Sequence, residues 1–103
     1  MKHGDLVNQC LLVLAEHGIA WSNATGALKD ASGRLVRYGL NGSSDILACI
    51  KGRFVGVECK VGRDRQSDTQ KRFEQAVTRH DGIYILARSV EDVTARLNAE
   101  GLL

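Results

Sequence analysis

Apolar residues recur at helical spacing in three stretches of the chain. Leu6, Cys10, Val13 and Leu14 predict a helix from Asp5 to His17, which Gly18 ends. Phe73, Ala76, Val77 and His80 predict a second helix that ends at Gly82, and a closing helix is predicted over Ser89–Ala99. Each of these helices has one apolar stripe, so each is expected to pack against a sheet.

Between the helices, short runs rich in β-branched and aromatic residues predict strands. Residues 46–50 are continuously apolar, which is typical of a strand covered on both faces, and "KGR" predicts a tight turn into a strand over Phe54–Lys60. "IYILA" predicts a later strand. "IAWSNAT" and "RLVRYG", separated by the turn-rich "GALKDASG", predict a hairpin.

These elements predict an α/β fold in one domain over residues 1–103, with a mixed β-sheet flanked by helices in the order α-β-β-β-β-α-β-α. The 103 residues suffice for one core, and 44% hydrophobic residues with no proline are typical of a globular protein. No apolar run approaches the roughly 20 residues of a membrane span, and the N-terminus lacks a signal-peptide pattern, so a cytoplasmic protein without membrane contact is expected.

Cysteine usage and net charge restrict the function further. Cys10, Cys49 and Cys59 lie among apolar neighbours without metal-ligand spacing to the histidines, so buried free thiols are predicted. The net charge of +2 alone does not indicate a nucleic-acid partner. Basic residues do cluster after residue 62, where a solvated helical face and a phosphate-binding surface are both open: Arg63, Arg65, Lys71, Arg72 and Arg79.

Three charged residues interrupt the two predicted central strands. With a two-residue turn at Lys51 and Gly52, antiparallel pairing places Asp45 opposite Glu58, and a turn one residue longer shifts them by one step. In both registers the Cβ atoms lie about 5 to 8 Å apart. Lys60 shares the face of Glu58.

Two neighbouring carboxylates in a sheet repel each other, so a compensating charge is expected. A divalent cation provides it, and oxygen ligands with few protein contacts favour Mg²⁺ or Mn²⁺ and phosphodiester chemistry. Lys60 would orient the attacking water or add positive charge. The alternative is that Asp45 is a turn residue and that Glu58 and Lys60 form a surface ion pair on an edge strand.

Two further residues are candidates for the same site. Gln70 precedes Phe73 by about one helical turn and could contact water or phosphate; alternatively it completes a capping box with Ser67. Asp5 could give a third carboxylate to the metal, or it could be a helix N-cap or a partner of the helix dipole.

With these residues identified, the chain resembles the virus-type replication-repair nuclease (VRR-NUC) domain, a branch of the PD-(D/E)xK nuclease superfamily. The resemblance covers nearly the whole chain. It is carried by the segments "WSNATG", "RYGLNGSSDIL", "GRFVGVECKVG", "SDTQKRFEQAV" and "IYILARSVEDV".

The resemblance implies a restriction-endonuclease-like core and metal-dependent DNA hydrolysis. Asp45 matches the aspartate of the PD motif, Glu58 and Lys60 match the ExK, and Gln70 matches the glutamine that follows. Metal ligands would be Asp45, Glu58 and the main-chain carbonyl of Cys59. Ser44 replaces the motif's proline, and Asp5 stands where many relatives have glutamate, so a metal contact by Asp5 is a weaker expectation.

Small members of the family imply a phage or prophage enzyme that acts as a homodimer on branched DNA such as four-way (Holliday) junctions, a two-fold arrangement that suits a two-fold substrate. Phosphate contacts would come from Arg63, Arg65, Lys71 and Arg72. Asn23, in "WSNATG", is a candidate DNA-backbone contact or an ordinary strand-end turn residue.

Two other functions remain open on the sequence. A DNA-binding module with the same fold could lack hydrolysis, although the set of Asp45, Glu58 and Lys60 favours catalysis. Cleavage at a defined DNA sequence is disfavoured, because 103 residues leave little room for elements that contact base edges.

Overall fold

The structure, a computed structural model, describes all 103 residues and contains three helices and six strands. The helices are α1 (His3–His17), α2 (Asp68–Arg79) and α3 (Val90–Ala99). The strands are β1 (Ile19–Ser22), β2 (Gly26–Lys29), β3 (Leu35–Tyr38), β4 (Ile46–Ile50), β5 (Arg53–Cys59) and β6 (Ile83–Ala87). The chain therefore has one strand more before α2 than the sequence pattern predicted.

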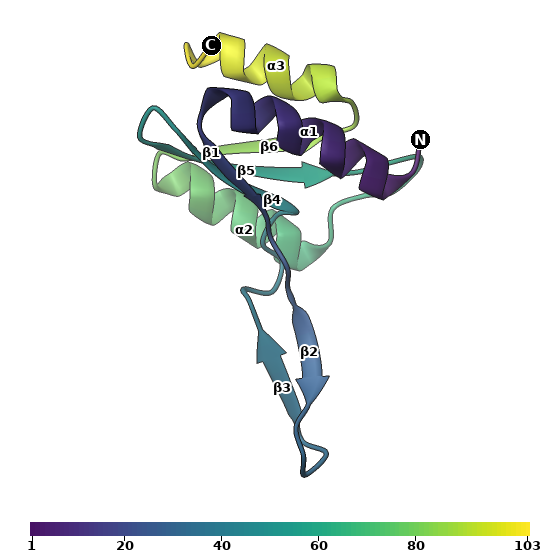
Figure 1. Cartoon of the computed structure of the whole chain (residues 1–103). Helices are drawn as coiled ribbons and strands as arrows, with labels where there is room; N and C mark the ends of the chain where they lie inside the picture. Colours follow the sequence, from purple (N-terminus) through teal and green to yellow (C-terminus); the bar gives the residue numbers. More distant parts are fainter.

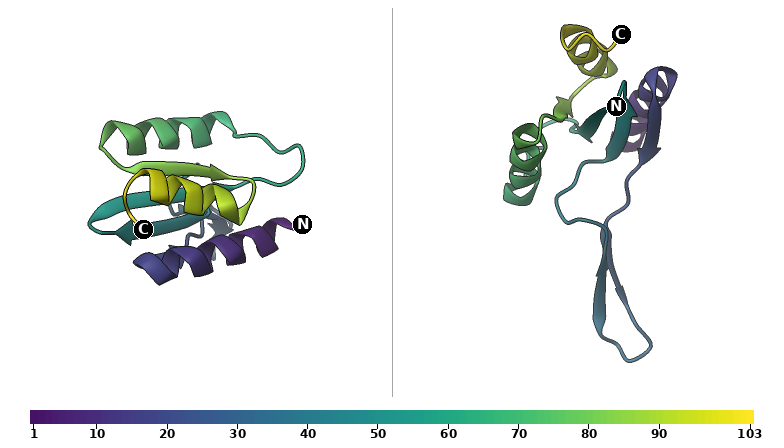
Figure 2. Two further views of the ribbon diagram at one scale, coloured as in Figure 1. Left: turned by 90° about the horizontal axis from the view of Figure 1, so that it is seen from above. Right: turned by 90° about the vertical axis from the view of Figure 1, so that its left-hand side faces the viewer.

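Four of the strands form one mixed sheet in the order β1-β4-β5-β6, in which only the β5–β6 pair is parallel. Helices α1 and α3 lie on one face of this sheet and α2 lies on the other (Figures 1 and 2). The predicted mixed sheet flanked by helices is confirmed. The apolar strands β4 and β5 are the two central strands, as their composition predicted.

The main core lies between the sheet and the layer of α1 and α3. Alternation along β5 directs Val55, Val57 and Cys59 into this core, where they meet the apolar stripe of α1 at Leu6, Cys10 and Leu14. The opposite face of β5 carries Gly56 and Glu58 toward the α2 side, and Lys60 follows directly after the strand. There α2 packs through Phe73, whose ring stands edge-on to Tyr84 with centroids 6.2 Å apart.

The β4–β5 hairpin has the shorter of the two turns that the sequence allowed. Ile50 pairs with Arg53 and Ile46 with Val57, and both turn residues have positive φ, 50° at Lys51 and 79° at Gly52. Two such residues make the turn whose twist matches that of the flanking strands. This register fixes which side chain of β5 lies nearest to Asp45.

The predicted hairpin between "IAWSNAT" and "RLVRYG" is wrong. β1 pairs with β4 in the main sheet, and β3 pairs instead with β2, the segment "GALK" that was expected to be a turn. The turn is confined to residues 30–34, because Oδ1 of Asp30 accepts hydrogen bonds from the backbone N–H groups of Ser32 and Arg34, both at 2.9 Å. Residues 26–29 lie outside this turn and form β2.

The β2–β3 hairpin, residues 26–38, is called the arm below. It projects away from the body in both Figure 1 and Figure 2, and every residue of its two strands is exposed. The principal-axis extents of the molecule are 49, 31 and 24 Å, and the radius of gyration of 14.4 Å exceeds the roughly 13 Å of a compact chain of this length. The arm therefore adds surface to the molecule but no core.

One cysteine and the start of α1 differ from the predictions. Cys10 and Cys59 are buried, but Cys49 is exposed, because it alternates along β4 with the buried Ala48 and Ile50 and so points away from the main core. Helix α1 begins at His3, two residues before the predicted start, with Lys2 as N-cap. No helix combines the length and the apolar composition needed to cross a lipid bilayer.

Candidate functional site

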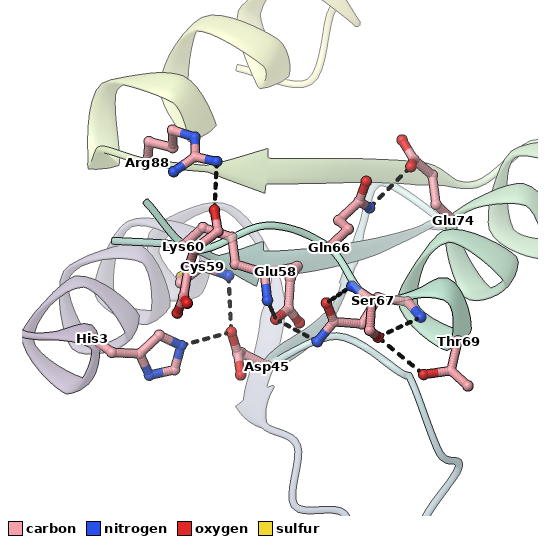
Figure 3. A network of polar contacts seen from close by, with 12 residues as sticks. His3, Asp45, Glu58, Cys59, Lys60, Gln66, Ser67, Thr69, Glu74 and Arg88 are labelled. Carbon is pink, nitrogen blue, oxygen red and sulfur yellow. Dashed lines mark hydrogen bonds and ion pairs between the residues drawn. The ribbon is translucent and has the colours of Figure 1, made fainter. Parts of the chain in front are cut away.

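Asp45 lies directly before β4, and its side chain takes the place of a backbone partner at the end of the β4–β5 ladder. β4 starts only at Ile46, so the N–H of Cys59 has no strand partner there; Oδ2 of Asp45 accepts its hydrogen bond at 2.8 Å. One position beyond the Ile46–Val57 pair, Asp45 stands opposite Glu58, and Figure 3 shows the two carboxylates side by side. Of the two registers that the sequence left open, the structure has the one that places these residues directly opposite each other.

Glu58 is buried on a central strand with only 4% of its surface exposed. Burial, and secondly the negative charge of Asp45, raise the pKa of Glu58, while the ammonium of Lys60 acts in the opposite direction. The site therefore holds a carboxylate whose charge the protein alone does not fully compensate.

Lys60 provides the nearest positive charge. Its Nζ lies 3.4 Å from Oε2 of Glu58, and the two side chains are 10% and 5% exposed. The alternative of a surface ion pair on an edge strand is wrong, because β5 is a central strand and both groups are withdrawn from water. Taking two ions out of water is costly, so this pair marks a functional site more readily than a stabilising contact.

Gln70 forms the capping box that the sequence offered as one of its two roles, and its side-chain amide also contacts Glu58. Its backbone N–H donates to Oγ of Ser67 and its Oε1 accepts from the N–H of Ser67, which together form the predicted capping box at the start of α2. Its Nε2 donates to Oε2 of Glu58 at 3.2 Å. The helix cap thus fixes the amide that orients the buried carboxylate.

A residue that the sequence analysis passed over, His3, contacts the other carboxylate. Its Nε2 lies 3.1 Å from Oδ2 of Asp45. Asp5 lies in the first turn of α1, is exposed, and makes no side-chain hydrogen bond or ion pair; the structure does not bring it together with Asp45 and Glu58. The signal available in the sequence was only that a helix expected to approach the site carries a histidine in its first turn.

The main-chain carbonyl of Cys59 was the third expected metal ligand. Within an extended strand the N–H and C=O of one residue point to the same edge. The N–H of Cys59 points to Asp45, so its carbonyl faces that edge too, at the place where β4 has ended. Its thiol lies in the core, where a hydrogen bond with Cys10, and then burial, raise the pKa of the Cys59 thiol.

Asn23 and Ser44 hold the loop that carries Asp45. The side-chain amide of Asn23 donates to Oγ of Ser43 at 2.7 Å and to the carbonyl of Ser44 at 2.9 Å, and its backbone N–H donates to the carbonyl of Asp45 at 2.8 Å. Ser44 is buried and its Oγ donates to the carbonyl of Ile46. In this structure Asn23 is therefore a scaffold of the site, with its amide turned toward the loop.

The predicted phosphate-binding residues all lie at the surface, in the loop after β5 and in the first half of α2. They are exposed and form no ion pair within the chain: Arg63, Arg65, Lys71 and Arg72. Arg88, which the sequence analysis did not single out, holds this loop by donating to the carbonyls of Gly62 at 3.2 Å and Asp64 at 2.8 Å. A hollow of about 240 Å³ lies beside it, between Arg88 and Lys60.

The donor set suits a hard divalent cation with several non-protein ligands. No three His, Cys, Asp or Glu side chains are arranged so that they could hold a metal ion by themselves, and the protein offers two carboxylates and a carbonyl at this place. Mg²⁺ and Mn²⁺ are commonly held by one or two carboxylates plus water and substrate phosphate. Such an ion would compensate the buried negative charge of Glu58.

A scan of the sequence against protein-family models and a search among curated proteins both found no match.

Proposed function

We propose that this protein is a Mg²⁺- or Mn²⁺-dependent endonuclease that hydrolyses phosphodiester bonds in branched DNA. The observation that carries the proposal is the group formed by the buried Glu58 and Lys60 and the partly exposed Asp45 at the end of the central hairpin. Two carboxylates opposite each other, with one ammonium at 3.4 Å from the inner one, leave a net negative charge that favours binding of a divalent cation.

Each residue of the site has a task that its contacts support. Asp45, Glu58 and the Cys59 carbonyl would hold the ion, which supplies Lewis-acid stabilisation of the charge that develops on the scissile phosphate. Lys60, kept in place by Glu58, would hydrogen-bond to the attacking water. Gln70 would hold Glu58 in its orientation, and His3 would do the same for Asp45.

The finer parts of the proposal rest on the resemblance to the VRR-NUC domain. These are the restriction-endonuclease-like core, the preference for four-way junctions and the homodimer that would present two sites to a two-fold junction. The mixed four-stranded sheet with helices on both faces is compatible with such a core. The exposed arginines and lysine after β5 would contact phosphates and make binding sensitive to salt.

The deciding experiment compares cleavage of four-way, flap and linear duplex DNA in Mg²⁺, Mn²⁺ or chelator. Wild type is expected to cut the branched substrates only with metal, and Glu58→Gln is expected to be inactive. Glu16→Gln makes the same chemical change at an exposed position of α1 and should behave as wild type. Full activity of Glu58→Gln, or no metal-dependent cutting on any substrate, would refute catalysis at this site.

Two further outcomes correct parts of the proposal. Binding of all three DNAs without cutting would identify a DNA-binding module that keeps the fold. Equal rates on linear duplex and junction would remove the structure specificity and leave a general nuclease.

A further inference from the structure

The arm is an element that the proposed active site does not use. Its two strands pair only with each other, in the register Gly26–Tyr38, Ala27–Arg37, Leu28–Val36 and Lys29–Leu35. A two-stranded hairpin with nothing packed on either face is marginally stable in water. A segment of this kind suggests a surface that a partner covers.

The register divides the arm into two different faces. Directly paired residues share a face, and so do residues two apart on one strand. Lys29 and Arg37 therefore lie on one face with their partners Leu35 and Ala27; this face is called the basic face. Leu28, Val36 and Tyr38 lie on the opposite face. All of these side chains are exposed.

The arm also carries the whole net charge of the protein. It contains three basic residues, Lys29, Arg34 and Arg37, and one acidic residue, Asp30, for a net charge of +2. The chain as a whole has a net charge of +2, so the remaining residues are neutral in sum.

Two of the four charged residues of the arm form an ion pair with each other, and two do not. In the turn, Oδ2 of Asp30 lies 3.4 Å from Nε of Arg34. Lys29 and Arg37 have no ion-pair partner in the chain. The cations of the basic face are therefore free for an external anion.

The root of the arm is tied to the active-site loop. Asn23, just before β2, donates through its side chain to Ser43 and Ser44, and its backbone N–H donates to the carbonyl of Asp45. On the other side of the root, Gly42 packs directly against Thr69 at the start of α2. The loop that carries Asp45 is thus held next to the place where the arm leaves the body.

We propose that the arm is a DNA-gripping ribbon whose basic face lies along the phosphate backbone next to the cleaved strand. This inference rests on the proposed function, since it takes DNA as the substrate. A two-stranded ribbon has dimensions that fit a DNA groove, and phosphate contacts position a protein without selecting sequence. The charge complementarity between the unpaired cations and a polyanion favours DNA over a second protein chain as the occupant of the basic face.

The test removes two charges from the basic face in the double variant Lys29→Gln/Arg37→Gln. The control Lys51→Asn/Arg96→Gln removes two charges from the β4–β5 turn and the last turn of α3. Binding to a four-way junction and to linear duplex is measured by fluorescence anisotropy over a range of salt concentrations, with Ca²⁺ in place of Mg²⁺. Circular dichroism and thermal melting are expected to match wild type, because the arm supplies no core residue.

The arm variant is expected to bind both DNAs more weakly, with the slope of log K against log salt reduced by about 2, one for each lost phosphate contact. The control is expected to keep the wild-type slope. Wild-type affinity and slope in the arm variant would overturn the proposal. So would a change of oligomeric state in sedimentation, because the basic face would then be packed against a second copy.

Failure of the arm and failure of the nuclease proposal give different results. Metal-dependent cutting by wild type together with unchanged binding of the arm variant refutes the ribbon alone. Arm-dependent binding without any cutting refutes the nuclease and supports the ribbon.

Discussion

Oδ2 of Asp45 accepts a hydrogen bond of 2.8 Å from the backbone N–H of Cys59. This contact joins the loop before β4 to the last residue of β5 and places the Asp45 carboxylate beside Glu58. The same side chain therefore completes the sheet and forms half of the candidate metal site. A substitution can separate these two roles.

Asp45→Asn keeps an oxygen acceptor for the Cys59 N–H but removes the negative charge. We expect a melting temperature close to that of wild type and a loss of metal-dependent cleavage of at least about 100-fold. Losing a residue that only supports a metal ligand costs up to about 100-fold, and a ligand itself should cost no less. Asp45→Ala also leaves the N–H without an acceptor, so it should lose both stability and activity. An active Asp45→Asn enzyme would contradict the assigned role.

The raised pKa of Glu58 predicts the pH dependence of stability in the metal-free protein. Burial and the charge of Asp45 raise this pKa above its ordinary value of 4.5, so the folded protein keeps a proton that the unfolded chain has lost. Stability should therefore fall as pH rises from the ordinary pKa through the raised one, and stay lower above it. Urea unfolding from about pH 4 to pH 8 in chelator measures this fall.

Glu58→Gln should flatten that part of the pH profile, because glutamine does not titrate. Glu16→Gln, at an exposed position, should leave the profile unchanged. Identical profiles for wild type and Glu58→Gln would show that Glu58 does not contribute to the pH dependence.

Gln70 joins a helix cap to the site, so its two functions can be tested with two variants. Gln70→Glu retains a capping-box residue but places a third carboxylate beside Glu58 and Asp45. The added repulsion should lower the melting temperature in chelator. It should also increase the rise in melting temperature that Mg²⁺ produces. Gln70→Ala removes the cap as well and should cost about 1 kcal/mol of stability. An equal response to Mg²⁺ in wild type and Gln70→Glu would place Gln70 outside the metal site.

Gly56 lies against Ser44, the residue before Asp45. A Cβ at this position would lie 2.8 Å from Oγ of Ser44 and 3.4 Å from the ring of Phe73. Gly56→Ala must displace Ser44, next to Asp45, and is expected to cost about 1 to 3 kcal/mol and to lower activity. Gly4→Ala, where a Cβ meets nothing within 4 Å in α1, should be neutral or stabilise by up to about 1 kcal/mol. Thermal or urea unfolding of both variants checks the contrast.

The local parts of this fold could be predicted because their signals are local. The turn at Lys51 and Gly52 fixes the register of β4 and β5, and the register places Asp45 opposite Glu58. The capping box at Ser67 and Gln70 likewise depends on residues three apart. In each case, backbone conformation and short-range hydrogen bonds decide the geometry.

Other features depended on contacts between distant segments. β1 has only four residues and no local signal that selects its partner, and the open edge of β4 decides that it joins the main sheet while β2 and β3 form the arm. The contact of His3 with Asp45, 42 positions apart, depends on where α1 packs. Pairing between distant segments has no local signature, because it is determined by which apolar faces are left to bury.

The sequence by itself determined the charged residues of the site, their common face on one hairpin and the helix cap beside them, since side-chain alternation and turn chemistry act over a few residues. Only the tertiary structure decided that Glu58 and Lys60 are buried, because burial depends on which strands and helices cover β5 from either side. It also decided that residues 26–38 stand free of the body, since a strand joins a sheet only where an edge is available.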